Sequence, residues 1–353
     1  MKELKHMRKI LIRAPNWIGD AVMCLPALAC LRKASPEAEI TVLLKPKVKE
    51  IFLNNPDIDG IMEYQASNEH RGLSGRIRLS GEIKKRGFDA AILFQNAFDA
   101  AFLSFIAGIP ERIGYARDLR TPLLTRAVKL SAEIQRTHQI NYYLNIIKQI
   151  SPGHSDDVKP RLHVTDEEAG WAEKFLLGLG PVGTSFVGAA PGASYGPAKR
   201  WTGFGVLLKR LSQEFGLAPI VFGGAEDNEI CEKVYNDMGD AANKANLCGG
   251  ISLRQFMAIA NELSLFVTND SGPMHIASAL GVPTVAVFGS TEPRLTGPLN
   301  ALSRVVRRQT PCSPCFKREC VFGHYDCLAS ISADEVLSAS GELLKTIQGT
   351  TVV

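Results

Sequence analysis

Short apolar runs alternate with longer amphipathic segments along most of the chain. The short runs have the length of buried strands, and the longer segments repeat apolar residues three and four positions apart, as helices do. Strands that alternate with helices in this way form parallel sheets covered by helices. We expect strands at residues 10–12, 40–44, 90–94, 186–190, 220–223, 265–269 and 284–288.

The helical segments lie between these strands and fall into two groups. A polar stretch rich in helix breakers, residues 150–160, separates the groups and indicates a domain boundary. Thr165 and Glu168 form the capping-box pattern of a helix start. We expect helices at residues 21–33, 100–107, 137–150, 167–177, 203–215, 253–260 and 332–347.

The predicted fold class is α/β, with two doubly wound (Rossmann-like) parallel-sheet domains facing a cleft. The chain has 353 residues, more than one hydrophobic core usually serves, which agrees with two domains. We expect a first domain over residues 1–165, a second over 166–330, and a C-terminal helix in 331–353 that could return to the first domain.

Composition and charge narrow the function classes. The hydrophobic and charged fractions, 45% and 22%, are ordinary for a globular enzyme. A net charge of +4 suits an anionic small ligand but is weak for a nucleic-acid binder, so we expect no nucleic-acid partner. The apolar run 10–12 is too short for a signal peptide, and the stretch 100–109 is shorter than the roughly 20 residues that span a bilayer. We therefore expect a cytoplasmic protein.

In parallel sheets, ligands bind beyond the carboxyl ends of the strands. The first strand is followed there by residues 13–20, which end in Asp20 at the start of a helix. A carboxylate in that position either caps the helix or serves as a general base, and the turn alone does not distinguish the two. The turn lacks the Gly-x-Gly-x-x-Gly spacing, which counts against a nicotinamide dehydrogenase.

A second turn joins the strand at 265–269 to a helix that starts near Pro273. Ser271 and Gly272 would let a diphosphate approach free backbone N–H groups, and the helix dipole would favour its charge. Asp270 precedes these residues, and His275 adds a hydrogen-bond donor. The other interpretation is an Asx-turn cap followed by a core histidine.

Two further loops follow strands of the second domain. One contains Gly192 and ends in Lys199 and Arg200, two cations suited to the phosphates of a leaving nucleotide. The other carries Glu226, which could accept hydrogen bonds from ribose hydroxyls. Each loop alone also fits a solvated basic loop or a helix cap, but three such loops at one sheet edge indicate a nucleotide site.

Two patterns bear on metals. Asp57 and Asp59 resemble an Asp-x-Asp pair that holds a divalent cation, but Pro56 and Gly60 beside them favour a surface turn, so we expect no catalytic metal. Four clustered cysteines permit a structural zinc site, reduced thiols or a loop disulfide, and their spacing is not that of a common zinc finger. They are Cys312, Cys315, Cys320 and Cys327.

Four segments together resemble the ADP-heptose:lipopolysaccharide heptosyltransferases, and within that family the heptosyltransferase II group. They are residues 15–20, 107–112, 191–201 and 268–275, with the sequences PNWIGD, AGIPER, PGASYGPAKRW and TNDSGPMH. The resemblance implies a GT-B architecture with an N-terminal acceptor domain and a C-terminal ADP-heptose domain. It also implies a metal-independent, inverting transfer of L-glycero-D-manno-heptose to the first heptose of the lipopolysaccharide inner core.

The same resemblance implies roles for individual residues. Asp20 matches the proposed general base, which would take the proton of the acceptor hydroxyl as that oxygen attacks the anomeric carbon. Lys199 matches the lysine near the diphosphate and is the second catalytic candidate, and Glu226 matches the acid that binds ribose. The donor-binding residues would be Gly192, Lys199, Arg200, Glu226, Asp270, Ser271, Gly272 and His275.

The implied acceptor is lipid A–Kdo–heptose at the cytoplasmic face of the inner membrane. Its anionic groups suit Asn16, Arg112 and Arg120 as acceptor-binding residues, while a solvated basic face is the other interpretation of the arginines. Two other functions stay open. One is another GT-B nucleotide-sugar transferase or epimerase, and the other is a non-catalytic protein that binds ADP-sugars.

Overall fold

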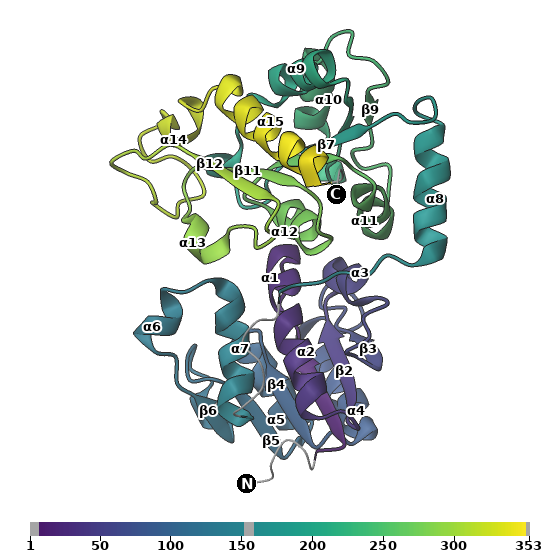
Figure 1. The fold of residues 1–353 in the computed structure, drawn as a ribbon. Coiled ribbons are helices and arrows are strands. Elements are labelled where there is room, and N and C mark those ends of the chain that lie inside the picture. Colours follow the sequence, from purple (N-terminus) through teal and green to yellow (C-terminus); the bar gives the residue numbers. More distant parts are fainter. Residues whose placement is uncertain (1–6, 152–158, 351–353) are drawn as a thin grey trace. The chain divides into compact units, whose positions relative to one another are not determined.

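The computed structural model describes residues 7–151 and 159–350. The chain divides into two compact units, Met1–Arg161 and Leu162–Val353. Each unit is built around a six-stranded parallel sheet with helices on its faces (Figure 1). The predicted fold class, two doubly wound α/β sheets, is confirmed.

The sheet of the first unit has the strand order β3-β2-β1-β4-β5-β6. Its inner strands β1, β2 and β4 bury nearly every side chain, because helices cover both faces of a parallel sheet. The edge strands β3 and β6 bury one residue each. The strands are β1 Lys9–Arg13, β2 Glu39–Leu44, β3 Gly60–Glu63, β4 Ala90–Leu93, β5 Glu111–Tyr115 and β6 Arg126–Val128.

Helices α4 and α5 cover one face of this sheet, where Leu79 and Leu103 pack on side chains of β1, β2 and β4. Helices α2 and α7 pack against each other on the opposite face (Figure 1). The helices are α1 Ile18–Met23, α2 Leu25–Ala34, α3 Lys49–Phe52, α4 Gly72–Arg86, α5 Phe98–Ile106, α6 Ala132–Gln135 and α7 Gln139–Ile150, with 3-10 turns η2 Pro46–Val48 and η3 Thr121–Leu123.

The single helix expected at residues 21–33 is in fact two helices, α1 and α2, which meet at Cys24. Pro26 explains the break, because it has no N–H to donate to an earlier carbonyl and is tolerated only in the first turn of a helix. Helix α1 begins at Ile18, so Asp20 lies within its first turn.

The sheet of the second unit has the order β12-β11-β10-β7-β8-β9. The four inner strands are buried throughout, and the edge strands β9 and β12 are partly exposed. The strands are β7 Phe186–Ala190, β8 Ala218–Val221, β9 Ala245–Asn246, β10 Leu265–Asn269, β11 Thr284–Phe288 and β12 Ser303–Arg307.

Helices α9, α10 and α15 form one core of the second unit with the strands, and Met274 of α12 packs on β11 in another cluster. The capping box predicted for Thr165 and Glu168 is confirmed at the start of α8. The helices are α8 Asp166–Leu177, α9 Phe204–Phe215, α10 Asn228–Asp237, α11 Leu253–Asn261, α12 Gly272–Ala279, α13 Pro293–Thr296, α14 Asp326–Ala329 and α15 Ala333–Thr350, with 3-10 turns η4 Pro197–Lys199 and η5 Ala225–Asp227.

The last helix, α15, packs on α9, β11 and β12 of the second unit. Its residues Val336, Leu337 and Leu343 are part of that unit's core. The apolar face of α15 is therefore buried in the second unit. Among the described residues, no helix is both long and apolar enough to cross a membrane.

Candidate functional site

The carboxyl ends of strands β7, β8, β10 and β11 lie at one edge of the second sheet, because these strands are parallel and adjacent. The loops after β7, β8 and β10, together with the first turns of α12, carry all the residues that the sequence predicts to bind a nucleotide. This edge is the candidate nucleotide site.

Near the centre of this edge, the ammonium of Lys199 and the carboxylate of Asp270 form a salt bridge, with 2.5 Å between Nζ and Oδ2. The hydroxyl of Thr291 donates a hydrogen bond of 2.5 Å to the same oxygen. The side chains of Lys199 and Asp270 are only 12% and 3% exposed, so water and salt screen the pair weakly. An ammonium has three N–H donors, so this salt bridge holds Lys199 in place and leaves further donors for an anion.

The side chain of Asn269, the last residue of β10, holds the loop that carries Lys199 by hydrogen bonds. Its Oδ1 accepts a hydrogen bond of 3.0 Å from the N–H of Trp201, and its Nδ2 donates one of 2.7 Å to the carbonyl of Pro191. These bonds tie both ends of the loop 191–201 to the neighbouring strand. No motif in the sequence marks this role, although a buried amide side chain at the end of a strand has to find polar partners.

Helix α12 begins directly after this turn, with Ser271 at the N-cap position. The Ser271 side chain makes no capping hydrogen bond and lies 3.4 Å from the hydroxyl of Thr268. The carboxylate of Asp270 is engaged by Lys199 and Thr291, so the alternative of an Asx-turn cap does not apply. A helix start that no side chain caps presents its first N–H groups to an anion.

Gly192 and Arg200 lie on either side of Lys199 in the same loop. A Cβ on Gly192 would lie 2.3 Å from Cγ of Asp227. Only glycine therefore lets the loop after β7 lie this close to the loop after β8. Arg200 donates from Nη2 to the carbonyl of Ala193 over 3.4 Å, and its Nε is buried without a hydrogen-bond partner in the part of the chain that is described. A buried guanidinium donor of this kind suits an anionic ligand.

The loop after β8 contains two carboxylates in different settings. Asp227 accepts a hydrogen bond of 3.3 Å from the N–H of Gly224 and so caps the turn η5. Glu226 is exposed in the same turn, where its carboxylate is open to solvent. The capping role considered for Glu226 is therefore filled by Asp227.

His275 of α12 is only 8% exposed, which agrees with the alternative of a core histidine.

In the first unit, Asp20 lies in the first turn of α1, after the carboxyl end of β1. The N-cap residue is Trp17, so Asp20 is not the cap. Oδ1 of Asp20 accepts a hydrogen bond of 3.0 Å from the hydroxyl of Tyr143 on α7. Burial, with the charge of Asp20, raises the pKa of Tyr143 well above its usual value, so this hydroxyl stays protonated and continues to donate. Tyr143 therefore orients Asp20.

Arg13, at the end of β1, sets the orientation of Asn16. Its Nη2 donates a hydrogen bond of 3.2 Å to Oδ1 of Asn16, and its Nη1 donates to the carbonyls of Ala14 and Leu43. Burial lowers the pKa of Arg13 to about 10, which still leaves the guanidinium charged at neutral pH. The predicted acceptor residue Asn16 is thus held at the same sheet edge as Asp20.

Arg120 lies in the interior of the first unit and not on its surface. Its side chain is fully buried and donates to three oxygens of the same unit, and burial lowers its pKa. Arg112 also donates to two nearby carbonyls. Arg120 is therefore not part of the open cationic surface that the sequence suggests, because a buried guanidinium has to satisfy its N–H groups internally, whereas Arg112 is only partly buried. The partners are Tyr115, Gln95 and Asn96 for Arg120, and Ile109 and Leu123 for Arg112.

Replacing Arg120 by alanine is expected to destabilise the protein by about 3 kcal/mol, because buried oxygens lose their charged donor. Urea denaturation measures this change in the free energy of unfolding. Its exposed neighbour Arg117 provides the control, and Arg117→Ala should change stability by less than about 0.5 kcal/mol. Unchanged stability of Arg120→Ala with weakened acceptor binding would instead support the original role.

The four clustered cysteines are free thiols. Burial and the charges of the other three cysteines raise the pKa of Cys327, whereas backbone hydrogen bonds, foremost that of Tyr325, lower the pKa of Cys320. Within residues 7–151 and 159–350, no three His, Cys, Asp or Glu side chains are placed to hold a metal ion. Of the three interpretations left open for these cysteines, the structural zinc site therefore lacks support in the geometry of the described residues.

Asp57 and Asp59 lie in a turn before β3, as predicted. Asp59 forms a salt bridge of 2.5 Å with Arg32 and accepts a hydrogen bond of 2.7 Å from the N–H of Ile40. The surface-turn interpretation is confirmed, and Asp59 is hydrogen-bonded to the backbone of the adjacent strand β2.

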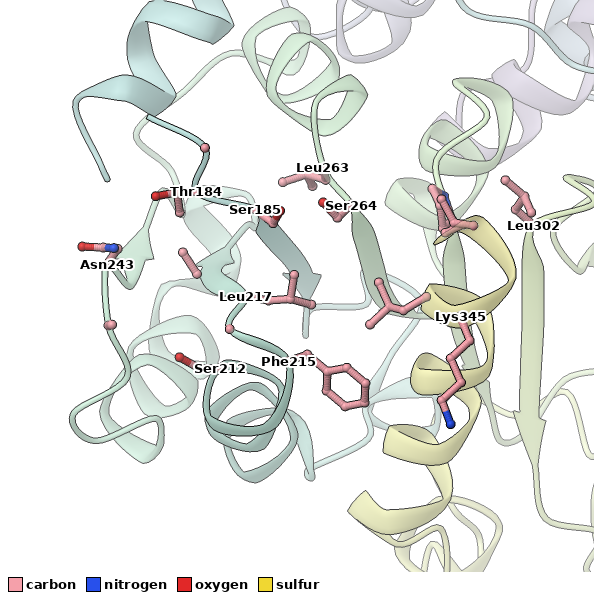
Figure 2. Close-up of a pocket in the computed structure, with 17 residues that line it drawn as sticks. Thr184, Ser185, Ser212, Phe215, Leu217, Asn243, Leu263, Ser264, Leu302 and Lys345 are labelled. Atoms are coloured by element: carbon pink, nitrogen blue, oxygen red, sulfur yellow. The ribbon is translucent and has the colours of Figure 1, made fainter. Parts of the chain in front are cut away.

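The second unit also contains a cavity of about 820 Å³ at the other edge of its sheet (Figure 2). Its lining includes Ser185, Leu217 and Ser264, which directly precede β7, β8 and β10, and Phe215 and Lys345 from α9 and α15. The predicted nucleotide residues follow the strands instead. The cavity is therefore separate from the candidate nucleotide site.

Comparison with known proteins gives consistent matches. The sequence profile of glycosyltransferase family 9 (heptosyltransferase) matches residues 76–326. The chain is 28% identical over 346 residues to lipopolysaccharide heptosyltransferase 2 of Escherichia coli K12, covering 95% of this chain and 98% of that protein. The structure of E. coli ADP-heptose lipopolysaccharide heptosyltransferase II is similar with a TM-score of 0.83 at 27% identity, covering 96% of this chain and 99% of that one. A family 9 glycosyltransferase from Veillonella parvula is similar with a TM-score of 0.85 at 25% identity, covering 98% and 99%.

Proposed function

Because the chain belongs to glycosyltransferase family 9, the heptosyltransferase family, we propose that it transfers heptose from ADP-heptose to the first heptose of the lipopolysaccharide inner core. The chain has the GT-B fold of these enzymes. The observation that carries the proposal is the Lys199–Asp270 salt bridge next to the uncapped start of α12. A fixed ammonium and a helix N-terminus suit the diphosphate of a nucleotide sugar. The similar E. coli enzyme is named for ADP-heptose, which supports this donor.

In this proposal the second unit binds ADP-heptose. Lys199, Arg200 and the first turn of α12 contact the phosphates, and Glu226 accepts hydrogen bonds from the ribose. As the bond between heptose and ADP breaks, negative charge gathers on the leaving phosphate. Fixed cations and backbone N–H groups then stabilise the transition state more than the ground state.

The proposed general base is Asp20. It takes the proton of the acceptor hydroxyl while that oxygen attacks the anomeric carbon from the side opposite ADP, which inverts the configuration. The hydrogen bond from Tyr143 to Oδ1 supports this role, because it holds the carboxylate in one orientation and cannot be lost by ionisation of the tyrosine near neutral pH.

We expect the reaction to need no metal ion, because Lys199 and Arg200 can supply positive charge to the leaving diphosphate. Chelation with EDTA should leave the initial rate of heptose transfer unchanged, and added Mg²⁺ should not raise it. A loss of rate on chelation that Mg²⁺ restores would contradict this expectation.

The proposed function is tested with purified protein, ADP-heptose and inner-core acceptors that carry no heptose, one heptose or two. We expect transfer to the acceptor with one heptose and a single new linkage in the product. Transfer only to the heptose-free acceptor would assign the enzyme to an earlier step of core assembly. Conversion of the nucleotide sugar without an acceptor would favour an epimerase, and binding without turnover would favour a non-catalytic protein.

The proposed acceptor, lipid A–Kdo–heptose, is anchored by its acyl chains. The reaction would therefore take place at a lipid surface, and we place it at the cytoplasmic face of the inner membrane.

A further inference from the structure

A row of aromatic side chains lies on the outer face of helix α5. Phe98, Phe102 and Phe105 are spaced by four and three residues, so they share one side of the helix. Phe98 and Phe105 are 48% and 49% exposed, and the rings of Phe98 and Phe102 stack with centroids 6.0 Å apart. The other side of α5, including Leu103, is buried in the core. Helix α5 is therefore apolar on both its inner and its outer side.

The first two turns of α4 carry two more exposed apolar side chains. Leu73 is 62% exposed and Ile77 is 58% exposed, one helical turn apart. A salt bridge of 2.6 Å between Nε of Arg76 and Oδ1 of Asp99 ties these turns to the start of α5. The two helices pack together over the same face of the sheet. The α4–α5 face is defined here as Leu73, Ile77, Phe98, Phe102 and Phe105.

Cations border the α4–α5 face. Helix α4 contains five Lys or Arg residues against one Glu, which is a net charge of +4. The guanidinium of Arg112 lies 5.4 Å from the ring centre of Phe105, and Arg71 is exposed just before α4. Exposed Phe and Leu beside Lys and Arg are typical of surfaces that rest in the headgroup region of an anionic bilayer. The five cations of α4 are Arg76, Arg78, Lys84, Lys85 and Arg86.

Scattered exposed apolar residues need no such explanation, because they are common on protein surfaces. In the second unit, Leu177, Val182 and Val206 are exposed singly, whereas Phe316, Val321 and Phe322 lie on an irregular loop. The α4–α5 face differs because its side chains adjoin on two packed helices and lie next to cations. A second copy of the chain would bring the same positive charge against it, whereas an anionic lipid surface complements that charge.

We propose that the α4–α5 face docks the protein on a bilayer of anionic phospholipid. The phenylalanine, leucine and isoleucine side chains enter the interface, and the cations of α4 other than Arg76, which Asp99 engages, pair with headgroup phosphates. Helices α4 and α5 follow β3 and β4, so both begin at the edge of the first sheet that also carries Asp20. Docking brings that edge to the lipid surface. Docking gives the enzyme access to a lipid-anchored acceptor, and this part of the proposal rests on the proposed function.

The test is co-sedimentation of the full-length protein with lipid vesicles. Vesicles of phosphatidylethanolamine and phosphatidylglycerol are compared with vesicles of phosphatidylcholine alone. The variant Leu73→Ser/Ile77→Ser/Phe98→Ser removes part of the face, and Leu177→Ser/Val182→Ser/Val206→Ser is the matched control in the second unit. We expect the wild type and the control to bind anionic vesicles alike, and the face variant to bind at least about tenfold more weakly.

The same assay also tests whether electrostatic attraction contributes to vesicle binding. Binding of the wild type should be weaker on phosphatidylcholine and should fall as salt is raised. The charge-reversal variant Arg78→Glu/Lys85→Glu should also bind anionic vesicles more weakly, and it leaves the apolar side chains intact. Equal binding by the wild type, the face variant and this variant would overturn the proposal, as would no binding by the wild type.

Transfer to a deacylated acceptor in solution separates this proposal from the proposed function. The face variant should match the wild type on that acceptor and fall behind it on an acceptor embedded in anionic vesicles. Soluble transfer by a wild type that does not bind vesicles would overturn the docking surface and leave the function standing. Vesicle binding without transfer to either acceptor would overturn the function instead. A wild-type dimer that the face variant dissociates, without vesicle binding, would assign the face to self-association and overturn the docking proposal.

Discussion

Replacement of Asp20 by asparagine is expected to lower kcat for heptose transfer by about 10³-fold while the affinity for ADP stays unchanged. The amide has the size of the carboxylate and can still accept the hydrogen bond from Tyr143, but it cannot take a proton from the acceptor. Steady-state kinetics with the one-heptose acceptor measures kcat, and calorimetry with ADP measures nucleotide affinity. The proposed assignment puts Asp20 on the acceptor side of the reaction, so the two quantities should separate.

Asp240→Asn, at an exposed carboxylate of the second unit, is the control and should retain full activity. Tyr143→Phe should lower kcat by less than Asp20→Asn, because it removes the hydrogen bond that orients the base and leaves the base itself. Turnover retained in Asp20→Asn would refute the assignment. A larger loss in Tyr143→Phe than in Asp20→Asn would mean that the tyrosine acts on the substrate directly.

The second large effect is expected at Lys199. Replacement by methionine keeps most of the apolar stem and removes the charge, so kcat should fall by about 10²–10³-fold and the affinity for ADP should fall with it. The variant should also be less stable, because the Asp270 side chain, 3% exposed, loses its cation. Transfer kinetics, ADP titration and thermal unfolding measure the three effects.

A double variant separates binding from structure at this salt bridge. Lys199→Met/Asp270→Asn removes both charges, so it should recover much of the lost stability without recovering activity. Lys209→Met, at a lysine of α9 whose side chain is 41% exposed, is the control and should change neither. Recovery of activity in the double variant would show that Lys199 serves only to neutralise Asp270, which contradicts its proposed role at the diphosphate.

The strands that the sequence predicts are all interior strands of the two sheets. Four of the strands that it misses, β3, β6, β9 and β12, are the sheet edges. An edge strand pairs on one side only and stays partly exposed, so it has no continuous apolar run to recognise. The inner strand β5 was also missed, because it begins with the polar pair Glu111 and Arg112.

The candidate nucleotide site was predictable to the extent that it follows interior strands. The turn after β10 and the loop after β7 could be located from the runs that end before them, and their cations and small residues are visible in the sequence. The salt bridge between Lys199 and Asp270 could not be predicted, nor could the hydrogen bond from Thr291 to the same carboxylate. Both depend on the order in which strands lie side by side in the sheet.

By itself, the sequence determined the α/β class, the interior strands other than β5 and the family, because apolar periodicity and local motifs are properties of neighbouring residues. Only the tertiary structure decided which polar groups meet and which are buried. Tyr143 reaches Asp20 across 123 positions of the chain, and Arg120, which looks like a surface cation, is fully enclosed. Burial and hydrogen-bond partners are set by the packing of distant segments, which local sequence patterns do not report.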